Sequence, residues 1–124
     1  MQIVNHPNIP ASNGHYSQCV EHNGILYLSG QLPINPLTRD IPETIEEQTD
    51  VALKNVETIL IEAGSSRKMV LQARIYISSI KLWAKVNDIY SIFFEHHKPA
   101  RTIIPTHELH FGCLIEIEVT AIKY

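Results

Sequence analysis

Apolar and polar residues follow two rhythms along this chain, and each rhythm predicts a different kind of element. Over residues 44–64 the apolar positions recur every three or four residues, which predicts an amphipathic helix. Thr44 and Glu47 have the spacing of a capping box at the start of this helix, and Gly64 suits its end. The same rhythm predicts a second helix at about residues 80–96.

The apolar stripe of the second helix includes four aromatic side chains. It consists of Leu82, Trp83, Val86, Ile89, Tyr90, Phe93 and Phe94. Aromatic residues at helical spacing belong far more often to a core than to a cofactor site. We therefore expect this stripe to pack in the core of the protein.

Alternation with a period of two predicts the strands. Residues 16–31 form a predicted hairpin, in which Asn23-Gly24 favours a two-residue turn because both positions need a positive φ. Residues 69–78 alternate in the same way, which predicts a strand with one buried face. Two further strands are predicted at about residues 101–109 and 113–123.

The predicted order of elements is β-β-α-β-α-β-β. This order favours the α+β class, with a mixed sheet and two helices packed on one of its faces. A chain of 124 residues has room for a single core, so we expect one domain over residues 1–124. No predicted helix is left to cover the second face of the sheet, so that face is either solvated or buried in an oligomer.

Composition and charge exclude several classes of protein. The chain is 44% hydrophobic and 19% charged, as in an ordinary globular domain, and its net charge of −3 lacks the footprint of a nucleic-acid binder. No apolar run reaches the length of a membrane span, and the first residues lack the pattern of a signal peptide. Cys19 and Cys113 lie in apolar, strand-like segments, as buried thiols do in a reducing compartment. We expect a cytoplasmic protein with no membrane partner.

Seven histidines raise the question of a metal site. His96 and His97 are neighbours at a helix end and therefore point in different directions. His107 and His110 are three residues apart, but a strand and a turn do not bring such a pair together as a helix would. We therefore expect no metal.

Three short segments carry side chains that could perform chemistry. Glu116 and Glu118 share one face of the last predicted strand, either as a solvent-facing surface or as carboxylates in a cleft. Arg101 stands at the entry to the preceding strand, either as a surface residue that caps a helix or as a clamp for a carboxylate. Ser29-Gly30 form either a plain strand end or a place where a ligand approaches the backbone.

Together and in order, these segments resemble the Rid family, also called YjgF, whose members are reactive enamine and imine deaminases. The resemblance runs from about residue 13 to residue 123 and is carried by GHYSQ (14–18), YLSGQLP (27–33), the helix at 46–64, VNDIY (86–90), KPAR (98–101) and IEIE (115–118). It implies a fold like that of chorismate mutase and a homotrimer whose three sheets form a central barrel. The active sites would lie between neighbouring subunits.

The resemblance also implies a hydrolase that acts on C–N bonds. It would convert 2-aminoacrylate, 2-iminopropanoate and 2-iminobutanoate into 2-keto acids and ammonia, without a metal or an organic cofactor. Arg101 would clamp the substrate carboxylate, and Glu116 would position the attacking water. The implied substrate-binding residues are Ser29, Gly30, Tyr16 and Asn87, whereas Glu118 would be structural.

The chain departs from the family pattern close to the expected cleft. His15 replaces a proline, Thr102 follows PAR where the family often has serine, and residues 109–112 replace the usual L-P-K-D turn. These departures put the substrate range in question. They also leave open a non-catalytic trimer that binds a small carboxylate or acts as a regulator. Ribonuclease activity, which has also been attached to this family, finds no basic stripe and no stacking platform in the sequence, so we expect no nucleic-acid partner.

Overall fold

The computed structural model describes residues 1–7 and 12–124, and its strands form one mixed sheet. The strands are β1 (Gln2–Val4), β2 (Cys19–His22), β3 (Ile25–Leu28), β4 (Val70–Ile77), β5 (Ala100–Pro105) and β6 (Ile115–Ile122). They lie in the order β1-β2-β3-β6-β4-β5, with β4 and β5 parallel and the other neighbours antiparallel. The helices are α1 (Ile45–Glu62) and α2 (Trp83–Phe94), and short 3₁₀ turns occupy Arg67–Met69, Ile80–Leu82 and His110–Gly112.

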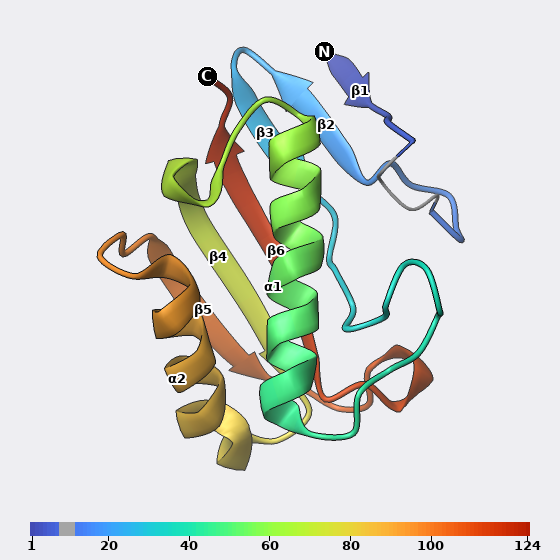
Figure 1. Cartoon of the computed structure of the whole chain (residues 1–124), viewed down its shortest axis with the longest axis vertical. Coiled ribbons are helices and arrows are strands. Elements are labelled where there is room, and N and C mark those ends of the chain that lie inside the picture. The colour runs from blue at the N-terminus through green and yellow to red at the C-terminus, as the bar shows by residue number, and fades with distance from the viewer. Residues whose placement is uncertain (8–11) are drawn as a thin grey trace.

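Both helices lie on the same face of this sheet, which we call the helix face (Figure 1). The alternation of β6 shows why the helices pack there. Ile115, Ile117 and Val119 point to the helix face and are completely buried, whereas Glu116 and Glu118 point to the opposite, open face and are partly exposed. The predicted α+β class, with a mixed sheet and two helices on one face, is confirmed.

The predicted helix start and hairpin turn are also confirmed. The Thr44 hydroxyl accepts a hydrogen bond of 3.2 Å from the Glu47 amide at the start of α1. At the other end of the molecule, Asn23 and Gly24 join β2 to β3 with φ angles of 52° and 79°. Both values lie in the left-handed region that this turn requires.

Two strand predictions are corrected by the structure. β1 is an additional strand that pairs with β2, and its three residues are too few for alternation to reveal it. β5 ends at Pro105, not at residue 109. Proline has no N–H to continue the ladder, and the Thr106 amide donates back to the Ile77 carbonyl at 2.8 Å as the chain leaves the sheet.

The second helix differs from its prediction at its first turn. Residues 80–82 form a 3₁₀ turn before α2 begins at Trp83, and the Trp83 side chain remains 41% exposed. Tyr90, Phe93 and Phe94 are buried, so the expectation of a core stripe is right for these rings and wrong for Trp83. No helix within residues 1–7 and 12–124 combines the length and the apolar character needed to cross a lipid bilayer.

Candidate functional site

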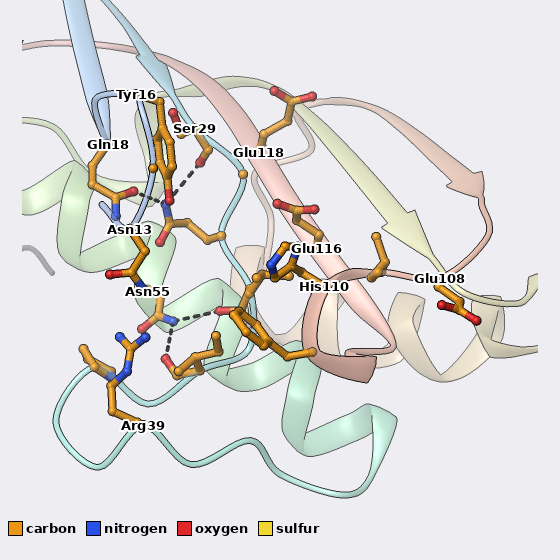
Figure 2. Close-up of a pocket in the computed structure, with 18 residues that line it drawn as sticks. Asn13, Tyr16, Gln18, Ser29, Arg39, Asn55, Glu108, His110, Glu116 and Glu118 are labelled. Atoms are coloured by element: carbon orange, nitrogen blue, oxygen red, sulfur yellow. Dashed lines mark hydrogen bonds between the residues drawn. The ribbon is translucent and has the colours of Figure 1, made fainter. Parts of the chain in front are cut away.

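A groove of about 740 Å³ opens where the chain leaves β3, next to the glutamates of β6 (Figure 2). Four of the six predicted site residues line it, namely Tyr16, Ser29, Gly30 and Glu116. The remaining walls come from segments 13–18, 29–39 and 108–111, together with Asn55 and Glu118. The fold thus brings together side chains that lie far apart in the sequence, such as Tyr16 and Glu116, which are 100 positions apart.

The carboxylate of Glu116 lies directly against the backbone of Gly30. A Cβ atom at residue 30 would collide with Oε2 of Glu116 and approach Cδ to 2.9 Å, so a side chain at this position would displace the carboxylate. Gly30 is required here for close approach and not for an unusual φ. This contact links the SGQ and EIE motifs, which sequence alone could only place on separate strands.

Burial determines the protonation behaviour of Glu116. The low-dielectric surroundings raise the pKa of its carboxyl, and repulsion from the charge on Glu118 raises it further. The positive form of His110 opposes these two effects and lowers the same pKa. A carboxyl group with a raised pKa, in a groove open to small molecules, can accept a proton from a bound water.

The end of β3 offers the groove one unused hydrogen-bond donor. Among the described residues, none accepts a hydrogen bond from the Gly30 amide, whereas Gln31 forms a reciprocal backbone pair with Ile117 of β6. The Ser29 hydroxyl donates to the Ser17 carbonyl at 2.6 Å, so it can meet a ligand only as an acceptor. Of these two groups, only the Gly30 amide is therefore able to donate to a ligand.

Glu118 lies further along β6 and is held by two neighbours on β4. The Tyr76 hydroxyl donates to Oε1 of Glu118, and Nε of Arg74 lies 3.2 Å from the same oxygen. Hydrogen bonding to the carboxylate raises the pKa of Tyr76. These contacts occupy Glu118 with structural partners, while the side-chain carboxylate of Glu116 has no hydrogen bond or ion pair within the described residues.

Arg101 and Asn87 lie outside the groove, on the helix face. Arg101 pairs in register with Ala73 of β4, whose side chain is completely buried under the helices. Its guanidinium donates to Oδ1 of Asn87 at 2.9 Å and lies over the Tyr90 ring, 4.8 Å from the centroid. Within one chain, therefore, Arg101 and Glu116 occupy opposite faces of the sheet.

Several groove residues were not predicted from the sequence. Asn55 of α1 donates to the carbonyls of Leu32 and Ile34 and so holds the loop after β3 in place. Arg39 at the tip of that loop has a φ of 67°. No motif pointed to these residues, because their role depends on how the loop folds back over α1.

His110 and Phe111 also line the groove. They belong to the segment 109–112, and the only signal in the sequence was that this segment departs from the family pattern. His15, the other departure near the cleft, is exposed and is not among the lining residues.

Cysteine and histidine side chains are dispersed through the molecule. Cys19 and Cys113 are both buried and free, and burial raises the pKa of the Cys19 thiol to about 11. Within residues 1–7 and 12–124, no three His, Cys, Asp or Glu side chains are grouped closely enough to hold a metal ion.

Comparison with known proteins places this arrangement in a family. The profile of the family described as Endoribonuclease L-PSP matches residues 6–123. A RutC family protein of Aquifex aeolicus is 41% identical, over 99% of this chain and all of the relative. The Lactococcus lactis protein named "Putative regulator AldR" is 40% identical over 98% of this chain and 97% of its own length. The Escherichia coli protein named "Putative reactive intermediate deaminase TdcF" is 29% identical over 98% and 97%.

Solved structures agree with these relatives. The Yersinia pestis protein YyfA, of the Rid family, superposes with a TM-score of 0.93 at 41% identity and covers 98% of both chains. Escherichia coli TdcF with bound serine superposes with a TM-score of 0.94 at 28% identity over the whole of both chains. As its motifs predicted, the chain belongs to the Endoribonuclease L-PSP family, the family of the Rid and YjgF proteins.

Proposed function

We propose that this protein hydrolyses reactive 2-imino acids and their enamine tautomers, such as 2-aminoacrylate, 2-iminopropanoate and 2-iminobutanoate, to 2-keto acids and ammonia. The observation that carries the proposal is the Glu116 carboxylate, free of hydrogen bonds and ion pairs among the described residues and seated on Gly30 in an open groove. The name of the relative TdcF as a reactive intermediate deaminase supports the same reaction class.

Glu116 would act on the attacking water in this reaction. An iminium carbon is already electrophilic, so the protein has to orient a water molecule and accept one of its protons. A carboxylate whose pKa is raised by burial is a better proton acceptor than an exposed one. The free amide of Gly30 would donate to the substrate, and Tyr16 would form a wall of the pocket. No cofactor is needed in this scheme.

Arg101 would bind the substrate carboxylate, but it cannot do so in the groove of its own chain. It lies on the helix face at the β5 edge of the sheet, whereas Glu116 is on the open face. A site that contains both residues therefore needs two copies of the chain. We propose a homotrimer in which the open faces meet and each active site combines Glu116 of one subunit with Arg101 and Asn87 of a neighbour.

A second candidate is a carboxylate-binding or regulatory protein without turnover. Two comparisons favour it specifically. The relative AldR is named as a regulator, and the TdcF structure holds serine, an amino acid with a carboxylate. The same groove and the same Arg101 would serve this function, so only a test for turnover separates the two candidates.

The charge of the groove does not favour RNA cleavage, although the family description contains the word endoribonuclease. Its walls carry three glutamates, Glu108, Glu116 and Glu118, against one arginine, Arg39. A phosphate backbone is bound by the opposite balance of charge. We therefore propose a small carboxylate and not a nucleic acid as the ligand.

The decisive experiment generates the imine in place. A serine or threonine dehydratase produces the 2-imino acid, and keto acid formation is followed with and without the protein. We expect clear acceleration over buffer by the wild type and loss of the acceleration in Arg101→Ala. Binding of pyruvate or 2-oxobutanoate in calorimetry without any acceleration would instead establish the carboxylate-binding function.

A further inference from the structure

His110 is a titratable side chain in the groove for which the reaction outlined above has no role. It is the first residue of the 3₁₀ turn His110–Gly112 and lines the same cavity as Glu116 and Gly30. Figure 2 shows its ring beside the Glu116 carboxylate, with both side chains on the groove. The second histidine nearby, His107, lines a different hollow together with Ser78 and Thr106.

The turn holds His110 in a defined place. The Cys113 amide donates to the His110 carbonyl at 3.1 Å, and the Gly112 amide donates to the Leu109 carbonyl at 3.2 Å. Phe111 has a φ of 59°, which a bulky residue rarely adopts, and its ring packs edge-on against the His110 ring at 4.4 Å. The imidazole is thus supported from one side and faces the groove.

His110 and Glu116 are electrostatic neighbours that do not touch. The charge of His110 acts on Glu116 in the sense of lowering its pKa. Within the described residues, however, no hydrogen bond or ion pair joins the two side chains. Because both side chains line the groove, a small ligand bound there can contact both groups.

We propose that His110 is a second acid–base residue of the groove, which gives a proton to the leaving nitrogen while Glu116 handles the proton of the attacking water. This inference rests on the proposed function. It concerns a residue from the segment 109–112, in which the chain differs from the family pattern.

The reaction requires a group that protonates the leaving nitrogen, and the proton balance shows how His110 would do so. Water adds to the iminium carbon and gives one proton to Glu116, while the C=N π electrons become a lone pair on nitrogen. The imidazolium of His110 then protonates that nitrogen, the C–N bond breaks, and the hydroxyl proton of the collapsing intermediate returns to the imidazole. Ammonia takes the proton held by Glu116 and leaves as ammonium, so both side chains return to their starting states.

The other charged or titratable groups of the groove are less suited to this role. The Arg39 guanidinium has no acceptor atom, and Tyr16 lines the groove as a wall of the pocket. Glu108 and Glu118 are carboxylates, and Glu118 is occupied by Arg74 and Tyr76. Histidine is the side chain that can both give and accept a proton near neutral pH.

Kinetics of His110→Gln, with His107→Gln as the matched control, test this role. We expect kcat for imine hydrolysis to fall about 10²-fold in His110→Gln, with KM little changed, and to stay at the wild-type value in His107→Gln. Added imidazole should restore part of the activity of His110→Ala. Wild-type turnover in His110→Gln would overturn the proposal, and so would a loss of kcat that imidazole does not rescue.

Titration of the Glu116 carboxyl by ¹³C NMR separates a failure of this inference from a failure of the proposed function, because it needs no activity. The midpoint should move to higher pH in His110→Gln, since the charge that lowers it is removed, and should not move in His107→Gln. If the midpoint moves but the wild type does not hydrolyse imines, the pairing of the two groups stands and the reaction is wrong. An unchanged midpoint together with an active wild type shows that His110 does not act on Glu116.

Discussion

The two faces of the sheet are built from the same strands but differ in what they complete. On the helix face, which α1 and α2 cover (Figure 1), Ile115, Ile117 and Val119 of β6 are fully buried. On the open face, the intervening Glu116 and Glu118 carry charges that are only partly buried. The helix face is therefore fully covered within a single chain. The open face carries the Glu116 carboxylate, whereas Arg101, the residue expected to act together with Glu116, lies on the helix face.

We infer from this difference that alternate residues of β6 serve different purposes. The apolar residues on the helix face stabilise the fold, and the glutamates on the open face are available for function. Substitutions on the open face should change activity with little effect on folding, because they remove no buried apolar area. Each of the following predictions tests that separation, and its failure would count against a difference in role between the two faces.

The largest effect is expected for Glu116→Gln. Loss of the proton acceptor should lower kcat for 2-iminopropanoate about 10³-fold, within the range known for general acid–base groups. The measurement is keto acid formation in the dehydratase-coupled assay. Glu108→Gln is the control, because Glu108 lines the same groove and is exposed, and it should remain close to wild type. Equal losses in both variants would show that the groove responds only to charge.

A smaller effect is expected for Arg101→Ala. Charged hydrogen bonds contribute about 1.5–3 kcal/mol, so kcat/KM should fall roughly ten- to a hundredfold. Arg101→Lys should recover only part of this loss, because lysine keeps the charge but not the planar fork. Steady-state kinetics on both variants test the prediction. If Arg101→Lys equals the wild type, then Arg101 is not a two-point clamp.

Gly30→Ala should separate activity from stability. The new methyl group would collide with the Glu116 carboxylate, which lies at the end of a flexible side chain and can move away. We therefore expect most of the activity to be lost, while the free energy of unfolding in urea changes by less than about 1 kcal/mol. A large loss of stability would mean that the Glu116 position is part of the structural core.

The smallest effect concerns stability and pH. The pKa of Glu116 is raised in the folded state, so its ionisation destabilises the fold as pH increases from the ordinary value of 4.5 through the raised one. Glu116→Gln lacks this cost and should be more stable than the wild type above that window, by less than about 1 kcal/mol given the exposure of the group. Below pH 4.5 the difference should vanish. Urea unfolding across pH measures it, and a wild type more stable than the variant at pH 7 would contradict it.

Much of the fold was predictable because its signals are local. Periodicity and the Thr44 cap predict the helix at 45–62, and Asn23-Gly24 predicts the hairpin turn. β1 escaped prediction because three residues cannot show alternation. Trp83 was misplaced because a 3₁₀ turn before α2 brings it to the surface at a position where periodicity predicted the core.

The candidate site was predictable only where motifs carry it. The grouping of Tyr16, Ser29, Gly30 and Glu116 in one groove agrees with the family resemblance. The position of Arg101 on the other face follows from parallel pairing of β5 with β4, which no sequence pattern reveals. Asn55 joins the groove because the loop after β3 folds back over α1, and His110 joins it through the 3₁₀ turn before β6, so their contribution could be found only in three dimensions.

The central claim is that one active site draws Arg101 from one copy and Glu116 from another. Arg101→Ala and Glu116→Gln should each keep about a tenth of the wild-type activity or less when alone, so the two variants are unfolded together, refolded at equal amounts and assayed. In a closed trimer, about a quarter of the interfaces would regain both native residues, and about a quarter of the wild-type activity should return. Activity no higher than that of the separate variants, in a mixture shown to contain mixed trimers, would contradict the account.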